Sequence, residues 1–191
     1  MYYEKVKRNF FNYPEWYREL YNILNDGDIF IEIGTWTGAS SLFFAELMMN
    51  GGKKIDFYTI DTFEGSKSLP PGPEKRFYAK TTILDGLYEY YMSVREPLKD
   101  YIKVIKGDSQ INETSSLFPD GSVAAIFIDG DHSHAGVARD LDNWYPKIRE
   151  GGIMSGHDYI WGGHGVKPVV DSFSEFKATE FHIGDVWYYE K

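Results

Sequence analysis

The sequence predicts an α/β fold in which a mostly parallel sheet carries helices on both faces. Three observations support this prediction. Short apolar runs of strand length alternate along the chain with longer segments of helical periodicity. The runs are nearly continuous in apolar residues, which is typical of parallel strands covered on both sides. Near the C-terminus, Gly184-Asp185 separates two short β-prone runs and indicates a hairpin, so we expect an antiparallel strand at one edge.

The first half of the chain predicts three helices and two strands. Pro14 is tolerated at the start of the first helix, and Gly34 and Gly38 bracket the turn after the first strand. A stretch rich in Gly, Pro and Ser separates the second strand from the third helix. The expected elements are a helix over 14–24, a strand over 28–33, a helix to about Met49, a strand over 55–60 ending at Asp61, a loop over 63–75 and a helix over 74–94.

The second half continues the alternation. Gly151-Gly152 is expected to close a long helix with Arg149 in its last turn, and Pro168 fits the first turn of the next helix. The expected elements are strands over 102–105, 123–128 and 152–156, helices over 135–150 and 166–176, and a hairpin formed by 181–183 and 186–189.

The chain of 191 residues fits a single domain over 1–191 with a substantial core. We expect residues 1–27 to form an N-terminal helical cap and 63–95 to form a loop and helix lid region. The aromatic content is 17%, with 15 Tyr. The Tyr-rich N-terminal helix and the helix near Tyr91 are therefore expected either to cover the active site or to form a homodimer contact.

Composition excludes several classes of function. The net charge of −9, without any run of Lys and Arg, argues against a nucleic-acid or anionic-membrane partner. The absence of cysteine excludes disulfides, zinc-thiolate sites and cysteine nucleophiles. No apolar stretch reaches the ~20 residues that span a bilayer, and the N-terminus does not resemble a secretory signal. We expect a cytoplasmic protein.

The most informative segment is Asp129-Gly130-Asp131-His132-Ser133-His134, which directly follows the apolar run Val123–Ile128. Ionisable groups at the end of a buried strand are costly unless they are solvated, paired or bound to a metal. In an open α/β sheet this edge is where ligands bind. The alternative is a solvated turn that caps the next helix, which we favour for Asp131, and His134 is expected to begin that helix.

The loop after the first strand reads Glu32-Ile33-Gly34-Thr35-Trp36-Thr37-Gly38. It lacks the G-x-G-x-x-G spacing with which a helix N-terminus binds a pyrophosphate. The pattern suits a ligand without phosphate, such as one with an amino-acid or sulfonium group. A plain strand-to-helix turn is the alternative interpretation, and Trp36 is expected to pack on a cofactor or at the pocket.

Polar residues follow two further strands at the same edge. Asp61 ends the second strand, where an acid can accept hydrogen bonds from both hydroxyls of a ribose. Asp108-Ser109 follows the third strand and suits the adenine side of a nucleoside. Each of these residues is also a plausible helix cap, but their occurrence at successive strand ends favours a nucleoside site.

The chain resembles the class I S-adenosylmethionine-dependent methyltransferases over essentially their whole domain. Three segments are most similar to the small-molecule O-methyltransferase branch, which includes the macrocin and cephalosporin types: 58–65, 127–132 and 156–159. The resemblance implies a Rossmann-like, doubly wound sheet of order 3-2-1-4-5-7-6 with the seventh strand antiparallel. The S-adenosylmethionine contacts that it implies are Glu32, Gly34, Thr35, Gly38, Asp61, Thr62, Phe63, Asp108, Ser109 and Asp129.

In that strand order the fourth and fifth strands are neighbours, ~4.8 Å apart. Asp129 and Asp158 end these strands, so their carboxylates can reach one divalent cation, Mg²⁺ or Mn²⁺. His132 is the expected proton acceptor, as in metal-dependent relatives. Relatives that modify sugars usually carry an acid at the position of His157, so His157 is expected either to bind the metal, to turn inward or to contact the cofactor.

We therefore expect an O-methyltransferase for a small hydroxylated substrate, which is a sugar, a polyol or a catechol-like molecule. Segments 63–79 and 159–165 are expected to cover the acceptor pocket. Two alternatives remain from the residues alone. One is a metal-dependent hydrolase or phosphoesterase built on the Asp/His cluster, and the other is a non-catalytic S-adenosylmethionine-binding protein. An NAD-dependent dehydrogenase is disfavoured because the pyrophosphate loop is missing.

Overall fold

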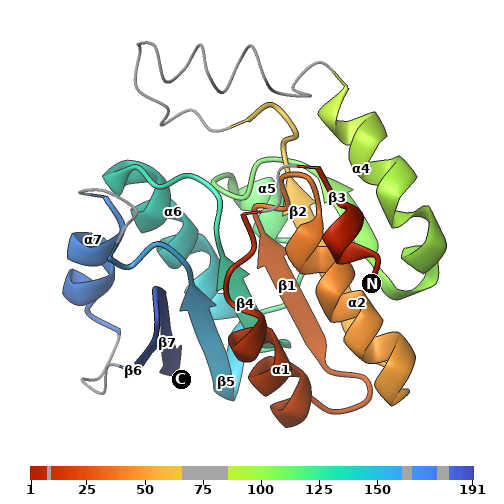
Figure 1. Ribbon diagram of the computed structural model, residues 1–191. Helices are drawn as coiled ribbons and strands as arrows, with labels where there is room; N and C mark the ends of the chain where they lie inside the picture. Colours follow the sequence, from red (N-terminus) through yellow and green to blue (C-terminus); the bar gives the residue numbers. More distant parts are fainter. Residues whose placement is uncertain (8–9, 66–85, 161–164, 176–180) are drawn as a thin grey trace.

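The computed structural model describes residues 1–7, 10–65, 86–160, 165–175 and 181–191. A central sheet has the strand order β3-β2-β1-β4-β5-β7-β6 (Figure 1). The strands are β1 (Ile29–Ile33), β2 (Asp56–Asp61), β3 (Lys103–Lys106), β4 (Val123–Ile128), β5 (Ile148–Gly156), β6 (Phe181–Ile183) and β7 (Val186–Glu190). The first five are parallel, and β7 runs antiparallel to β5 and β6. The predicted α/β class, the 3-2-1-4-5 order of the parallel strands and the terminal hairpin are confirmed.

Helices cover both faces of this sheet. They are α1 (Pro14–Ile23), α2 (Ala39–Gly51), α4 (Leu87–Arg95), α5 (Asn112–Ser115), α6 (His134–Trp144) and α7 (Val166–Ser172), with 3-10 turns η1 (Tyr3–Lys5), η2 (Glu96–Tyr101) and η3 (Tyr145–Lys147). One face packs against α1 and α2 and the other against α6 and α7 (Figure 1).

The two-sided covering explains why the strands are apolar throughout. Successive side chains of β1 point to opposite faces. Phe30 joins the core under α1 and α2, whereas Ile31 and Ile33 join the core under α6 and α7. All three are buried. Glu32, on the α1 and α2 side, is the one charged residue in this strand, and it is fully buried.

The predicted helix over 135–150 is wrong in its second half. The α-helix ends at Trp144, and Pro146 lies in the 3-10 turn that follows, because proline cannot donate the next helical hydrogen bond. The chain then enters β5 at Ile148, which is fully buried and pairs with Val123. Arg149 is therefore a strand residue, and its guanidinium donates to both oxygens of Asp28 at 2.5 and 3.1 Å.

Other boundaries shift by a few residues. The first helix ends at Ile23 and the helix predicted over 166–176 ends at Ser172. Residues 66–85, which make up most of the predicted lid region, lie outside the described residues. Of the predicted 74–94 helix, the structure therefore describes only α4, which begins at Leu87. Residues 161–164 of the second predicted covering segment also lie outside.

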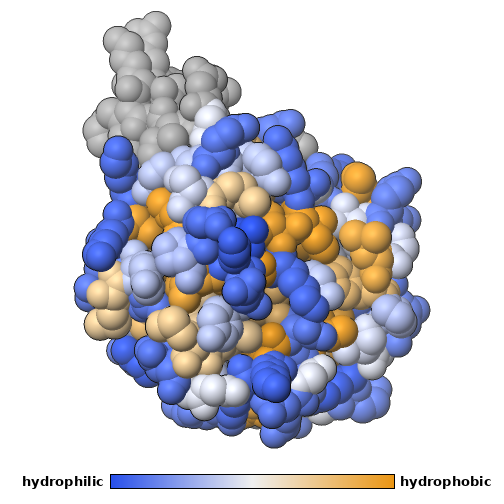
Figure 2. Space-filling model, turned by 90° about the vertical axis from the view of Figure 1, so that its right-hand side faces the viewer, coloured by the Kyte–Doolittle hydropathy of each residue, from blue (hydrophilic) through white to orange (hydrophobic). Residues whose placement is uncertain are grey.

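No helix in the described part of the chain is long and apolar enough to cross a membrane. On the face shown in Figure 2, hydrophobic residues lie between hydrophilic ones. The large hydrophobic residues with the greatest exposure lie in separate segments outside the helices and strands, among them Met1, Phe10, Leu117 and Ile160.

Candidate active site

The parallel strands end level with one another, which brings their following loops to one edge. In the register of the sheet, Ile33 at the end of β1 pairs with Ile60 of β2 and Ile128 of β4. Ile128 in turn pairs with Gly156 at the end of β5. The residues after β1, β2, β4 and β5 are therefore neighbours in space, as the sequence predicts for a ligand site at this edge.

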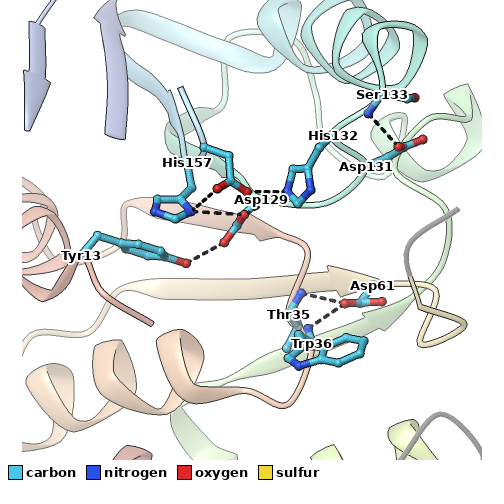
Figure 3. A network of polar contacts seen from close by, with 10 residues as sticks. Tyr13, Thr35, Trp36, Asp61, Asp129, Asp131, His132, Ser133 and His157 are labelled. Carbon is cyan, nitrogen blue, oxygen red and sulfur yellow. Dashed lines mark hydrogen bonds and ion pairs between the residues drawn. The ribbon is translucent and has the colours of Figure 1, made fainter. Parts of the chain in front are cut away.

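Asp129, His132 and Asp158 form a three-residue cluster at this edge (Figure 3). The Nε2 atom of His132 lies 3.0 Å from Oδ2 of Asp158 and 3.3 Å from Oδ1 of Asp129. The side chain of His132 is 33% exposed, that of Asp158 22% and that of Asp129 20%, so the cluster is accessible to solvent. Asp158 has φ +58, a backbone conformation that non-glycine residues adopt mainly where the surrounding structure holds them.

The two carboxylates determine the protonation of His132. Burial alone lowers the pKa of the imidazole, but the hydrogen bonds to Asp129 and Asp158 outweigh it and raise that pKa to about 10. Burial likewise opposes ionisation of Asp158, whereas its contacts with His132 and His157 bring the pKa of its carboxyl well below the ordinary value. Without a further cation, His132 is therefore a proton donor to both carboxylates at neutral pH.

His157 turns one ring nitrogen towards the same cluster. Its Nδ1 lies 3.4 Å from Asp158 and 3.8 Å from Asp129. Its Nε2 is buried and has no hydrogen-bond partner among the described residues. The sequence leaves open whether His157 faces the metal site, turns inward or faces the cofactor. In the structure, Nδ1 of His157 faces the two carboxylates. Asp185, from the turn between β6 and β7, adds a carboxylate oxygen within 4.8 Å of ligand atoms of His157 and Asp158.

Tyr13 is a member of the site that sequence reasoning missed. Its hydroxyl donates to Oδ2 of Asp129 at 2.8 Å, and its ring lies beside that of His157, with centres 4.5 Å apart (Figure 3). Its ring centre also lies 4.9 Å from that of Phe127. Tyr13 is the residue before Pro14, at the start of α1. No motif marks it, and only the Tyr-rich composition of the N-terminal segment pointed to this region.

Asp131 has the local role that the sequence predicts. Its Oδ1 accepts from the backbone NH of Ser133 at 3.0 Å, and its Oδ2 accepts from Nε2 of Gln110 at 3.1 Å. His134 is the first residue of α6, and the hydroxyl oxygen of Ser133 accepts from the backbone NH of Gly136 to cap that helix. Asp131 and His134 therefore organise the start of α6, and neither belongs to the cluster of Asp129.

The loop after β1 lies in close backbone contact with the loop after β4. Gly34 has φ +86, and a Cβ there would lie 2.0 Å from the carbonyl oxygen of Asp129. Glu32 beneath it is fully buried, and its carboxylate accepts hydrogen bonds from the hydroxyls of Tyr17, at 2.9 Å, and Ser41. Burial raises the pKa of Glu32 to about 7. In this structure Glu32 ties the strand to α1 and α2.

Asp61 holds together the loop after β1 and the loop after β2. Its Oδ2 accepts from the backbone NH groups of Thr35 and Trp36 at 2.7 and 2.9 Å (Figure 3). Its Oδ1 accepts from the backbone NH of Phe63 at 2.7 Å. Burial raises the pKa of Asp61 despite these bonds. Trp36 and Phe63 have φ +49 and +58, so both loops are held in uncommon conformations. The hydroxyl of Thr35 and the indole NH of Trp36 are buried and lack hydrogen-bond partners within the described structure.

The remaining residues of the loops after β1 and β2 that were predicted to contact S-adenosylmethionine are Gly38, Thr62 and Phe63. Gly38 directly precedes α2 with φ +93, and its missing side chain leaves room for the ring of Tyr91. The ring of Phe63 packs against Tyr88 and Tyr91, with centres 5.1 and 5.3 Å apart, and the hydroxyl oxygen of Thr62 accepts from the NH of Glu64 at 3.3 Å.

Asp108 and Ser109 follow β3 at the same edge. Oδ1 of Asp108 accepts from the NH of Gln110 at 2.9 Å. The carbonyl oxygen of Ser109 accepts from the indole NH of Trp144 at 3.0 Å and from the amide of Asn143 at 3.3 Å. Helix α6 therefore fixes the loop in which these two residues lie.

The family model described as a methyltransferase domain matches residues 31–159, which run from β1 through the site loops to the end of the cluster. The chain belongs to this family. It is an S-adenosylmethionine-dependent methyltransferase, and its sheet gives it the class I fold. Membership decides against the hydrolase that the Asp/His cluster alone left open.

Solved structures of similar fold include other methyltransferases. The O-methyltransferase NovP is 18% identical with a TM-score of 0.66, and the alignment covers 93% of this chain and 77% of NovP. The calicheamicin methyltransferase CalS11 is 15% identical with a TM-score of 0.63, covering 92% and 76%. MycE of the mycinamycin biosynthetic pathway, in complex with Mg and S-adenosylhomocysteine, is 17% identical with a TM-score of 0.57, covering 95% and 50%.

The same comparison includes an rRNA methylase from Streptococcus thermophilus, at 13% identity and a TM-score of 0.58. At such identities the likeness concerns the fold alone. The acceptor of this methyltransferase must therefore be argued from its own residues.

Proposed function

We propose that this methyltransferase transfers a methyl group from S-adenosylmethionine to a hydroxyl of a small molecule, with the help of a divalent cation. The observation that carries the proposal is the convergence of Asp129, His132 and Asp158 at the edge where the methyl-donor loops end. Methyl transfer needs an aligned acceptor oxygen and a group that takes its proton, and no protein nucleophile.

The proposed donor site follows the loops after β1, β2 and β3. The buried hydroxyl of Thr35 and indole NH of Trp36 support this assignment, because both are polar groups that lack a partner within the described chain. Asp61 shapes the site through the backbone of the loops after β1 and β2, and we assign the ribose to the space beside its carboxylate. The proposed contacts are Gly34, Thr35, Gly38, Asp61, Thr62, Phe63, Asp108, Ser109 and Asp129, with Glu32 acting from beneath the loop.

The cluster fits a divalent cation by its chemistry. Carboxylate oxygens of Asp129 and Asp158 are the ligands that Mg²⁺ and Mn²⁺ prefer, and Nδ1 of His157 faces them, a donor that suits Mn²⁺ better than Mg²⁺. The sequence contains no cysteine that would favour a softer metal. When bound, such a cation would lower the pKa of a coordinated hydroxyl and hold it in place.

His132 is the proposed proton acceptor. In the structure its pKa is raised because Asp129 and Asp158 bond to its Nε2. Once these carboxylates also serve a cation, they stabilise the imidazolium less, and the pKa of His132 moves towards its ordinary value of about 6.5. Nε2 then faces the acceptor hydroxyl as a base matched to neutral pH.

The experiment that tests the proposal is a methyl-transfer assay with isotopically labelled S-adenosylmethionine and a panel of catechols, sugars and polyols. We expect O-methylated product from at least one vicinal diol, a loss of product with EDTA, and recovery with Mg²⁺ or Mn²⁺. We expect His132→Ala to lower turnover by about 10²- to 10⁴-fold, the usual contribution of a general base. Turnover that EDTA leaves unchanged would refute the cation, and near-normal turnover of His132→Ala would refute the base.

A further inference from the structure

We propose that a pocket beside the cluster is the acceptor subsite, and that it takes a hydroxylated molecule bearing a protonated amine. This inference rests on the proposed function and narrows its substrate class. The pocket has a volume of about 430 Å³, a size that suits a small ligand. Its described lining is Asn12, Tyr13, Glu15, Trp16, Ile160, Gly184 and Asp185.

Two lining residues connect the pocket to the reacting groups. Tyr13 donates to Asp129 through its hydroxyl, and Asp185 lies with His157 and Asp158 in one potential ligand group. In Figure 3, Asp129 lies between Tyr13 on one side and Asp61 of the donor loops on the other. Tyr13 and Asp185 therefore place the pocket next to the cluster, and in this view Tyr13 and the proposed donor loops lie on different sides of Asp129.

The charge of the pocket selects against anionic acceptors. Glu15 and Asp185 contribute carboxylates and Asn12 an amide, whereas the described lining contains neither Lys nor Arg. The nearest basic partner of Glu15 is Arg18, at 3.6 Å in an exposed pair. Asp185 uses one oxygen to accept from the backbone NH of Ile160. A phosphate or carboxylate in this pocket would meet two like charges, whereas an ammonium group would be attracted.

The aromatic walls favour the same class of ligand. Trp16 is held rigidly, because its ring stacks on Tyr188 with centres 4.5 Å apart and its indole NH donates to Ser155 at 3.2 Å. Tyr13 is fixed by Asp129 and by its packing on His157. Fixed aromatic surfaces suit the apolar face of a ring, and they attract cations through their π electrons. Ile160, 61% exposed, adds apolar surface at the rim.

The test uses three catechols that present the same vicinal diol but differ in charge: dopamine, 4-methylcatechol and 3,4-dihydroxybenzoate. Calorimetry first measures the binding of S-adenosylhomocysteine to the full chain, and then that of each catechol with S-adenosylhomocysteine and Mg²⁺ present. We expect dopamine to bind most tightly and the benzoate most weakly. The readout is the ratio of the dissociation constants of the benzoate and of dopamine, which is greater than one if the proposal holds.

Glu15→Gln is the variant that tests the cause, and Glu19→Gln is its matched control. Both residues are exposed on α1, but only Glu15 lines the pocket. We expect Glu15→Gln to lower the ratio by about two- to fivefold, the usual size of an exposed charge interaction, and Glu19→Gln to leave it unchanged. A ratio of one or below, an equal effect of both variants, or S-adenosylhomocysteine binding without any catechol binding overturns the proposal alone. Failure of S-adenosylhomocysteine to bind overturns the proposed function with it.

Discussion

At the scale of single residues, Tyr13 decides how Asp129 presents its carboxylate. The tyrosine hydroxyl occupies Oδ2, so Oδ1 is left to face His132 and His157. A side chain that is held by a second partner needs no reordering when a ligand arrives, which is how outer partners support metal-binding residues. Tyr13 is therefore a positioning residue contributed by the N-terminal segment.

We predict that Tyr13→Phe lowers kcat/KM by about tenfold or more, the usual cost of losing an outer partner of a metal ligand. Tyr91→Phe is the matched control, because Tyr91 is also buried and bonds the hydroxyl of Thr59 at 3.0 Å, away from the cluster. Both variants should lose about 1 kcal/mol of stability in urea unfolding. Equal kcat/KM values for the two variants would contradict a positioning role for Tyr13.

Glu32 gives a prediction on pH. Its pKa is raised to about 7 in the folded protein, above its ordinary value near 4.5, because burial disfavours the charge. The folded state therefore holds its proton to higher pH than the unfolded chain does, and stability from this group is lost as pH rises from about 4.5 to about 7.

We expect Glu32→Gln to remove this pH dependence. The unfolding free energy of the variant, relative to that of the unchanged protein, should rise between pH 5 and pH 8 by on the order of 2 kcal/mol. Taking the difference between the two pH values cancels any constant loss from altered hydrogen bonds to Tyr17 and Ser41. Urea unfolding at pH 5 and pH 8 measures this change in relative stability. If the relative stability of the variant stays constant or falls between the two pH values, Glu32 is already ionised in the folded protein.

At the scale of elements, the loops after β1 and β4 touch through their backbones. Gly34 allows the carbonyl of Asp129 to approach where a Cβ would lie only 2.0 Å away. This contact couples the proposed methyl-donor loop to the residue that begins the cluster. The glycine was predicted from a tight turn, whereas the neighbour that requires it lies 95 positions further along the chain and is visible only in the fold.

We predict that Gly34→Ala lowers the unfolding free energy by more than about 3 kcal/mol, since it combines an unfavourable φ with a clash against fixed backbone. Gly121→Ala is the control. Gly121 has φ +67 but open space around its Cα, so only the conformational cost of about 1–2 kcal/mol applies. If thermal or urea unfolding gives both variants the same loss, the contact between the loops is not what requires Gly34.

The start of β5 shows where local pattern fails. Residues 135–150 suit a helix by spacing, but Pro146 ends it early. Long-range contacts then determine where the strand begins. Ile148 is fully buried beside Val123, and Arg149 pairs with Asp28, 121 positions away in sequence. A pattern read along the chain contains neither partner, so the boundary was misplaced by four residues.

At the scale of the whole molecule, the parallel order of β1 to β5 is what makes the site predictable. Residues directly after strands, such as Asp61, Asp129 and Asp158, could be assigned to one edge because parallel strands end together. Tyr13 and Asp185 could not. They reach the cluster from the N-terminal segment and from the antiparallel hairpin, whose positions over the edge depend on packing that no local spacing encodes.

The central claim is that Asp129 and Asp158 hold one divalent cation beside the methyl-donor loops. Its most direct test is Mn²⁺ binding, followed by electron paramagnetic resonance with S-adenosylhomocysteine present. Asp131→Asn is the control, since Asp131 lies two residues from Asp129 but its carboxylate accepts from Ser133 and Gln110 and lies outside the cluster of Asp129, His132 and Asp158. We predict one Mn²⁺ per chain, bound at least about tenfold more weakly by Asp129→Asn and Asp158→Asn and unchanged by Asp131→Asn. No bound Mn²⁺ in the unchanged protein, or equal weakening by all three variants, would contradict the claim.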